Sequence, residues 1–525
     1  MAIDETGGAA QAARASYHQI LRSSVLIGGS SLVTLAITLV RTKLIAVVLG
    51  PAGFGLLGVF SAIADLVRSV AGLGVNSSGV RQIAEATGSA DAPRIARTVV
   101  VLRRTALGLA VGGAIALVAL ARPIAQLTFG NDGHATSLRL LGAAVFLRLL
   151  ADGQAALIQG CRRLGDLARI NIVGAACGSV VALPAVWWLG EQGIALSLVA
   201  VAAAAAVVSL HYGRRIVTEP AVFVPGQARA ELGGLLRTGL AFMASALFTL
   251  GTAYVTRLII IRSDGLAAAG LYQAAWTVGG VYVGFVLQAM GADFYPRLVA
   301  VAPHHDACNR LVNEQTRIGL LVALPGILAT VALSPLIVVA IYSREYLGAV
   351  ELLRWVCAGM GLRIMSWPLG FIVVAKGRQA IYFLSELAWT VVSLLLAWAC
   401  IGRYGLRGAG IAFFLSYLFH TAMLIPIACH LTAFRWSPDN RRLAAAAGLA
   451  LAGVAAAVAW LPPTAAVFAG LALAFVAGLH SIAQLSRLVP PTQAPRALRL
   501  LCSLSERGMR LAWPLAHRPA SGGER

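Results

Sequence analysis

The sequence TKLIAVVLGPAGFGL, residues 42–56, has a related copy later in the chain, TRLIIIRSDGLAAAGL at residues 256–271. Each copy places a basic residue, Lys43 or Arg257, inside a long apolar segment. Further matched positions pair Gly50 with Gly265, Gly55 with Gly270, Arg139 with Arg354 and Arg148 with Arg363. Two copies that both keep basic residues at membrane depth are typical of two-lobed transporters whose central cavity binds an anion.

The composition independently predicts a membrane protein. Apolar residues make up 59% of the chain, charged residues only 12%, and the mean hydropathy is +0.81. A soluble core cannot hide so much apolar surface. Because a spanning helix needs roughly 20 apolar residues, the long apolar segments predict an all-α integral membrane protein with about fourteen transmembrane helices.

The repeat also predicts the topology. Each copy holds six predicted helices, and an even number returns the chain to the same side, so the halves are expected to be parallel repeats related by an axis along the membrane normal. We expect a first lobe at residues 1–215, a cytoplasmic linker at 216–231 and a second lobe at 232–432. Two helices within 440–486 have no counterpart and look like lipid-facing packing. Residues 487–525 are predicted to form a basic amphipathic cytoplasmic tail on anionic lipids.

The net charge of +21 follows the positive-inside rule. The loops predicted to be cytoplasmic carry most of the arginines, whereas the outer loops hold few. This alternation predicts a multi-pass membrane protein with both termini in the cytoplasm, and it explains the net charge without a nucleic-acid partner. No cleavable signal is expected, because Asp4 and Glu5 precede an apolar segment that is too long for one.

Two pairs of opposite charges lie inside predicted spans, where each charge costs roughly 2.5 to 3.5 kcal/mol at the helix centre. Asp65 and Arg68 are three residues apart, and Arg148 and Asp152 are four apart. Residues at these separations share one helix face, so each pair can neutralise itself. A structural ion pair is therefore an alternative to a functional role.

Other basic residues within the spans have no acidic residue within a turn; these are Arg41, Lys43, Arg257 and Arg363. A pseudo-twofold axis brings equivalent surfaces together, so Lys43 with Arg257, and Arg148 with Arg363, are expected to flank one cationic cavity. Arginine binds phosphate through charge-assisted hydrogen bonds, which favours a ligand with two phosphates. The open alternative is that Arg41 and Arg257 snorkel to the outer surface.

Three motifs carry a family resemblance: VRTKLI at 40–45, GPAGFG at 50–55 and SGVRQIAEA at 78–86. They resemble bacterial O-antigen and enterobacterial-common-antigen translocases, in the polysaccharide-transport branch of the multidrug/oligosaccharidyl-lipid/polysaccharide exporter superfamily. The resemblance implies a flippase that moves an undecaprenyl-pyrophosphate-linked oligosaccharide from the cytoplasmic to the periplasmic leaflet by alternating access. It also implies contact with other surface-polysaccharide assembly proteins.

When the inside of the membrane is negative, the membrane potential favours outward movement of an anionic head by roughly 2.3 kcal/mol per charge per 100 mV. Exchange for H⁺ or Na⁺ would add direction, and the candidate carboxylates are Asp65, Asp152 and Asp293. Asp293 also has Arg297 four residues later, as in a gating pair. No cofactor or metal site is expected, because His304-His305-Asp306 lacks a further spaced ligand.

Other functions fit the sequence less well. A membrane enzyme would need paired carboxylates or a metal-nucleotide site outside the membrane, and the longest outer loop offers only Asp132 and His134. A multidrug antiporter for organic cations would need an acidic lumen. A peptidoglycan-precursor flippase fits the charge, but the motifs favour surface polysaccharide. A cleft between lobes of one chain predicts a monomer.

Overall fold

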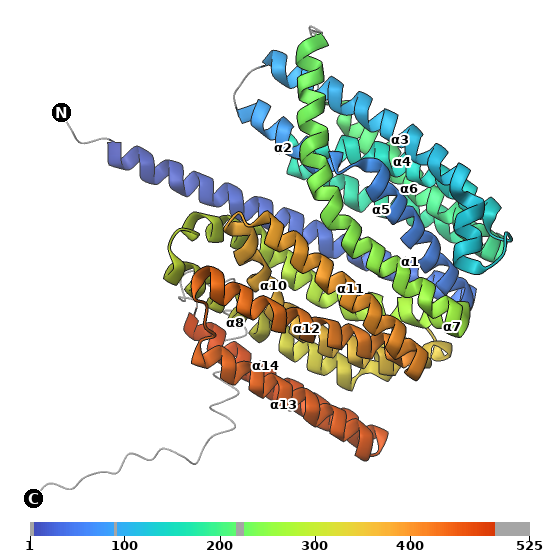
Figure 1. The fold of residues 1–525 in the computed structure, drawn as a ribbon, viewed down its shortest axis with the longest axis vertical. Coiled ribbons are helices and arrows are strands. Elements are labelled where there is room, and N and C mark those ends of the chain that lie inside the picture. Colours follow the sequence, from blue (N-terminus) through green and yellow to red (C-terminus); the bar gives the residue numbers. More distant parts are fainter. Residues whose placement is uncertain (1–4, 89–91, 217–224, 489–525) are drawn as a thin grey trace, which may run out of the picture. The chain divides into compact units, whose positions relative to one another are not determined.

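The computed structural model describes residues 5–88, 92–216 and 225–488. These residues form fourteen α-helices joined by short connections and two 3₁₀ turns, η1 at Gly190–Gln192 and η2 at Arg344–Ala349 (Figure 1). The helices are α1 (Glu5–Gly72), α2 (Val75–Gly88), α3 (Ala92–Phe129), α4 (Ala135–Gly160), α5 (Leu164–Leu189), α6 (Gly193–Gly213), α7 (Pro225–Val301), α8 (His305–Ala332), α9 (Ser334–Ile341), α10 (Val350–Ala375), α11 (Gln379–Tyr404), α12 (Leu406–Thr432), α13 (Pro438–Trp460) and α14 (Pro463–Leu488).

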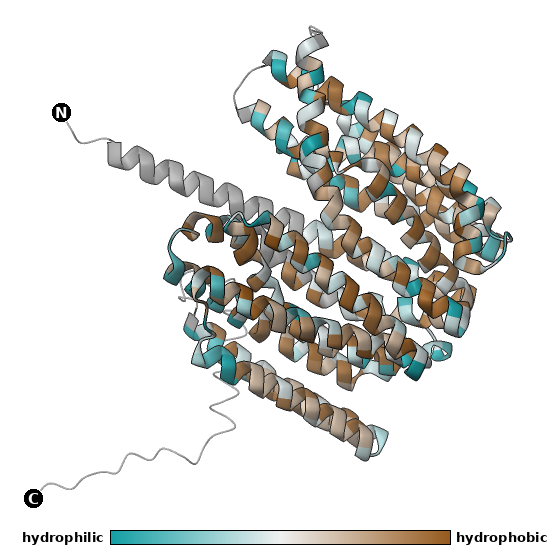
Figure 2. Ribbon diagram, in the orientation of Figure 1, coloured by the Kyte–Doolittle hydropathy of each residue, from teal (hydrophilic) through white to brown (hydrophobic). Residues whose placement is uncertain are grey.

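Eleven continuous helical segments in the described part of the chain are long and apolar enough to cross a membrane. Three of them are double length, at 29–72, 164–213 and 228–280. Each of these is long enough for two spans of roughly 20 residues. Apolar residues cover the helix bodies, and hydrophilic residues gather near helix ends and connections (Figure 2). The prediction of an all-α membrane protein with about fourteen spans is confirmed.

Matching glycines interrupt the two longest helices. Gly50 in α1 has φ 64° and ψ −177°, and Gly265 in α7 has φ 83° and ψ −179°. This backbone region is open essentially only to glycine. The repeat read from the sequence therefore corresponds to a shared backbone conformation, in which each glycine turns the chain from one span into the next.

The segments that follow these turns cross at a second pair of matched glycines. A Cβ atom on Gly55 would collide with the carbonyl oxygen of Leu266 and lie 2.8 Å from the amide nitrogen of Gly270. Conversely, a Cβ atom on Gly270 would collide with the carbonyl oxygen of Pro51 and lie 3.0 Å from the amide nitrogen of Gly55. Such reciprocal contacts between equivalent residues are those of a local twofold axis.

The chain divides into two compact units. Unit 1 comprises residues 1–274, 338–349 and 386–409, and unit 2 comprises residues 275–337, 350–385 and 410–525. The lobe boundaries expected from the repeat, 1–215 and 232–432, stay a prediction. Residues 217–224 of the predicted linker and residues 489–525 of the predicted tail lie outside the described residues.

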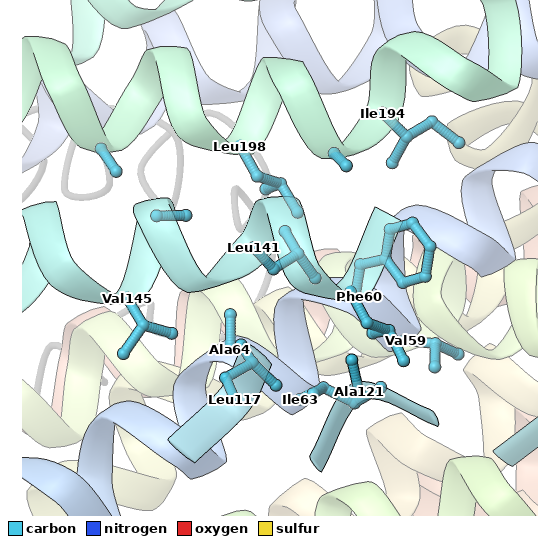
Figure 3. Close-up of a cluster of buried hydrophobic side chains, with 14 of the residues drawn as sticks. Val59, Phe60, Ile63, Ala64, Leu117, Ala121, Leu141, Val145, Ile194 and Leu198 are labelled. Atoms are coloured by element: carbon cyan, nitrogen blue, oxygen red, sulfur yellow. The ribbon is translucent and has the colours of Figure 1, made fainter. Parts of the chain in front are cut away.

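The core of unit 1 joins α1, α3, α4 and α6. Figure 3 shows side chains of these four helices meeting, with Phe60, Leu117, Leu141 and Ile194 fully buried. Small residues such as Ala64 let the helices approach closely, as is usual in membrane bundles. This packing fixes α1 against α4, and their half-buried charged side chains build the site described below.

The core of unit 2 is more aromatic. Phe294 of α7 packs against Trp367 and Phe371 of α10, with ring centroids 5.9 and 6.0 Å apart. At one end of this core, Asn313 of α8 accepts from the backbone N–H of Ser437 at 2.8 Å and from the side chain of Asn440 at 3.0 Å. These bonds anchor the start of α13 to α8.

Candidate functional site

An ion-pair network links α1 and α4 inside unit 1. Arg148 donates to Asp65 at 2.6 Å, and Arg68 donates to Asp152 at 2.9 Å. Arg68 also lies 3.7 Å from Asp65. The four side chains are 26 to 34% exposed. They therefore form one continuous chain of alternating charge at the interface between the two helices.

The sequence predicted different partners for two of these residues. It paired Arg148 with Asp152 on one helix face, whereas the structure pairs Arg148 with Asp65 and Asp152 with Arg68. The physical reason is that α1 and α4 pack against each other, so a long arginine reaches the carboxylate of the facing helix. Only the contact between Asp65 and Arg68 stays within one helix.

Arg257 of α7, in the second copy of the repeat, lies close enough to this network to be attracted by Asp65. Its guanidinium donates to the carbonyl of Ala253 at 2.9 Å and to the side chain of Gln273 at 2.8 Å. It lies 5.4 Å from the ring centroid of Tyr272 and is attracted electrostatically by Asp65. Arg257 is only 7% exposed, so its side chain does not snorkel to a surface.

Arg41 and Lys43 lie on α1 before the turn at Gly50. Arg41 is half-buried and is repelled electrostatically by Arg148. Lys43 is exposed, and its ammonium donates to the carbonyl of Ala340 at 2.6 Å. Of the two, Arg41 is the residue that interacts with the charge network.

The group formed by these electrostatic interactions carries excess positive charge. Its described members are Arg41, Arg68, Arg148, Arg257, Asp65 and Asp152. Four arginines face two carboxylates. Excess charge away from bulk water is costly unless a counter-ion or water compensates it. The arrangement is therefore suited to binding an anion.

A cavity of about 270 Å³ borders the network within unit 1. Arg68 and Asp152 line it together with polar residues after the end of α1, Asn76 and Ser77. The opposite part of the lining is apolar and includes Phe242 of α7. Sequence reasoning missed Asn76 and Ser77, because only the packing of α2 against α4 brings these polar side chains toward the ion pair.

The remaining candidates lie in unit 2. Arg363 of α10 is half-buried, and its guanidinium lies 5.8 Å from the ring centroid of Tyr417. Its expected place opposite Arg148 across one cavity stays a prediction. Arg297 is exposed, and the side chain of Asp293 lies outside the described residues.

This helical fold is shared with solved structures of polytopic membrane transporters. The lipid II flippase MurJ in its inward closed conformation has this fold, with a TM-score of 0.64, 12% identity, and coverage of 88% of this chain and 99% of that chain. A multidrug resistance transporter of the MATE family, of the MOP superfamily, also shares it in an inward-facing conformation. There the TM-score is 0.62 at 16% identity, over 76% of this chain and 95% of that chain.

Residues 44–351 match the model of a family described as polysaccharide biosynthesis protein, and the chain belongs to this family. The lipid III flippase of Escherichia coli (strain K12) is 24% identical over 411 residues, which are 77% of this chain and 97% of that protein. The expected link to polysaccharide biosynthesis and the multi-pass membrane character are confirmed. The relatives named here are flippases and transporters, in agreement with the prediction that the chain is not an enzyme.

Proposed function

We propose that the protein is a flippase for an undecaprenyl-pyrophosphate-linked oligosaccharide, the repeat unit of an O-antigen or a related surface polysaccharide. It moves this lipid from the cytoplasmic to the periplasmic leaflet by alternating access, with both termini in the cytoplasm. It acts as a monomer, without a cofactor, and delivers its substrate to other surface-polysaccharide assembly proteins. The family membership and the similarity to the lipid III flippase support this proposal.

The observation that carries the proposal is the excess of arginine in the charge network of α1, α4 and α7. A pyrophosphate offers several acceptor oxygens, and arginine binds them through paired, charge-assisted hydrogen bonds. Arg257 is a candidate for binding the phosphate once the site opens and exposes its side chain, because its present acceptors, Ala253 and Gln273, are both neutral. A phosphate would replace these neutral acceptors with a charged one.

The carboxylates suggest how transport is coupled. An arriving phosphate competes with Asp65 for Arg148 and with Asp152 for Arg68. A carboxylate that loses its arginine away from bulk water is best neutralised by a proton or Na⁺. For exchange, a proton or Na⁺ from the periplasm binds the unpaired carboxylate as the head leaves, and it is released into the cytoplasm on the return step, when the carboxylate pairs with its arginine again. Membrane potential adds to this cycle by favouring outward movement of negative charge.

Deletion of the gene in its host, followed by mass spectrometry of extracted polyprenyl-linked glycans, tests the proposal. We expect pyrophosphate-linked oligosaccharide to accumulate while surface polymer is lost. Arg257→Gln should fail to restore transport, whereas Arg257→Lys should restore part of it because the charge is kept. Arg441→Gln, an exposed position outside the network, serves as the control. Unchanged lipid-linked pools in the deletion strain would overturn the proposal.

A multidrug antiporter is the second candidate, because the fold is shared with a MATE-family transporter. The described network opposes it, since organic cations need acidic sites and here arginines outnumber carboxylates. Increased sensitivity of the deletion strain to cationic drugs, with normal glycan pools, would favour the antiporter. A peptidoglycan-precursor flippase would instead show accumulation of the cell-wall lipid.

A further inference from the structure

A groove on unit 2 lies outside the charge network and was given no role by the sequence. It runs between α8, α13 and α14 and has a volume of about 460 Å³, within the range of ligand pockets. Its lining is polar at one end and apolar along the rest. One end is polar and is formed by Arg317, Asp439, Arg442, His480, Ser481 and Gln484.

The rest of the groove is apolar. Its lining residues include Leu321, Leu324, Leu443, Ala446 and Leu473. From Asp439 to Ala450, α13 runs along the groove for about 16 Å at 1.5 Å per residue. All three helices are long and apolar enough to span a membrane. The groove therefore has one charged end and an apolar stem along membrane helices, which is the shape and polarity of a lipid.

The charge at the polar end selects the headgroup. Arg317 is already partly neutralised, since it bonds to Asp439 at 3.0 Å and to Gln484 at 2.9 Å. Arg442 is exposed and has no side-chain partner among the residues that the structure describes. Two arginines against one aspartate leave a net positive end. An anionic headgroup would complete it with charge-assisted hydrogen bonds.

We infer that this groove is a binding site for an anionic glycerophospholipid, such as phosphatidylglycerol, with its phosphate at Arg442 and Arg317 and one acyl chain along α13. The bound lipid fills the space between α8 and the helix pair α13–α14 and holds that pair to α8. The basic segment after Leu488 is a poor occupant, because its arginines, among them Arg496 and Arg499, would be repelled by the same end. The site does not depend on the transport proposal.

The arginine pair Arg441 and Arg442 provides a matched test of the headgroup contact. Both are exposed on α13, but only Arg442 lines the groove. Delipidated full-length protein in neutral detergent is titrated with dioleoyl phosphatidylglycerol or dioleoyl phosphatidylcholine, and bound lipid is counted by native mass spectrometry. We expect at least about tenfold preference for phosphatidylglycerol. Arg442→Gln should reduce its affinity roughly tenfold, and Arg441→Gln less than about twofold.

The neighbouring alanines Ala445 and Ala446 test the acyl-chain contact in the same way. Both are exposed, and only Ala446 lines the groove. Ala446→Phe should abolish retention of both lipids, whereas Ala445→Phe should leave it unchanged. The unfolding midpoint of each variant without lipid confirms that it remains folded.

Several results would overturn the inference. If Arg441→Gln and Arg442→Gln reduce the affinity for phosphatidylglycerol equally, the positive charge attracts the lipid without a defined binding site. Normal binding by Ala446→Phe would place the acyl chain elsewhere. Displacement of phosphatidylglycerol by equimolar undecaprenyl phosphate would assign the groove to the polyprenyl chain. A dimer that Ala446→Phe dissociates would assign it to a second copy of the chain.

Discussion

The two copies of the repeat share the backbone conformation of their turns but differ in their side-chain chemistry. Gly50 and Gly265 make the same turn, and Gly55 and Gly270 meet in a reciprocal crossing. In contrast, the ion-paired Asp152 of the first copy corresponds to Trp367 of the second, which packs on Phe371. The matched glycines thus constrain both copies in the same way, whereas the ion pairs between α1 and α4 lie in the first copy.

The largest effect is expected at the glycine crossing. Gly270→Ala should destabilise the protein by about 3 kcal/mol, because its Cβ meets backbone atoms that cannot rotate away. Gly55→Ala should cost about the same if the contact is symmetric. Thermal unfolding in detergent measures both. Gly251→Ala, on the same helix with open space around it, is the control and should change little. Clearly unequal costs at the two glycines would break the comparison.

The next largest effect concerns the two turns. Gly50→Ala and Gly265→Ala should each cost about 2 kcal/mol, because both glycines have positive φ with extended ψ. Neither introduced methyl group has a close contact, so strain alone sets the cost. Equal losses of the unfolding midpoint would show that the repeat conserves the turn for conformational reasons. A neutral Gly265→Ala variant would refute this explanation.

Removal of a carboxylate should show how strongly the charge concentrated in the first copy is coupled. Asp65→Asn should cost about 2 kcal/mol, because it leaves Arg148 unpaired and removes the attraction on Arg257. Asp152→Asn should cost about 1 kcal/mol, because Arg68 keeps its contact with Asp65. The stability of each variant is measured by unfolding in detergent, with and without a soluble pyrophosphate. Pyrophosphate should stabilise Asp65→Asn more than the wild type, and an equal response would contradict a shared anion site.

The smallest effect is a pH dependence at His134, which lies in the first copy. Burial beside the rings of Phe129 and Phe60 lowers the pKa of His134, and the charge of Glu191 partly opposes this. The unfolded chain then binds the proton more readily, so stability falls as the pH drops below the normal histidine value of about 6.5. His134→Gln should reduce the loss of unfolding midpoint between about pH 7.5 and 5.5. An unchanged pH response would locate the titrating group elsewhere.

Much of the site could be named from sequence, but its pairing could not. An arginine or aspartate inside an apolar segment is conspicuous, because its transfer into a membrane costs free energy. This cost identified Arg148, Asp65 and Arg257 as candidates. Which carboxylate meets which arginine depends on the rotation of α1 against α4, which a single helix pattern does not specify. Asn76 and Ser77 were missed for a related reason, because polar residues near a helix end are common and become informative only beside a cavity.

The sequence by itself determined the membrane class, the number of spans and a repeat whose matched glycines make the same turn. These features follow from hydrophobic length and from a repeated pattern, both of which are local properties of the chain. Only the tertiary structure decided that Arg148 bonds to Asp65 across α1 and α4, that Arg257 is buried, and that α8, α13 and α14 leave a groove with one charged end. The physical reason is that ion pairs and grooves are made by side chains from separate helices, whose meeting is set by packing.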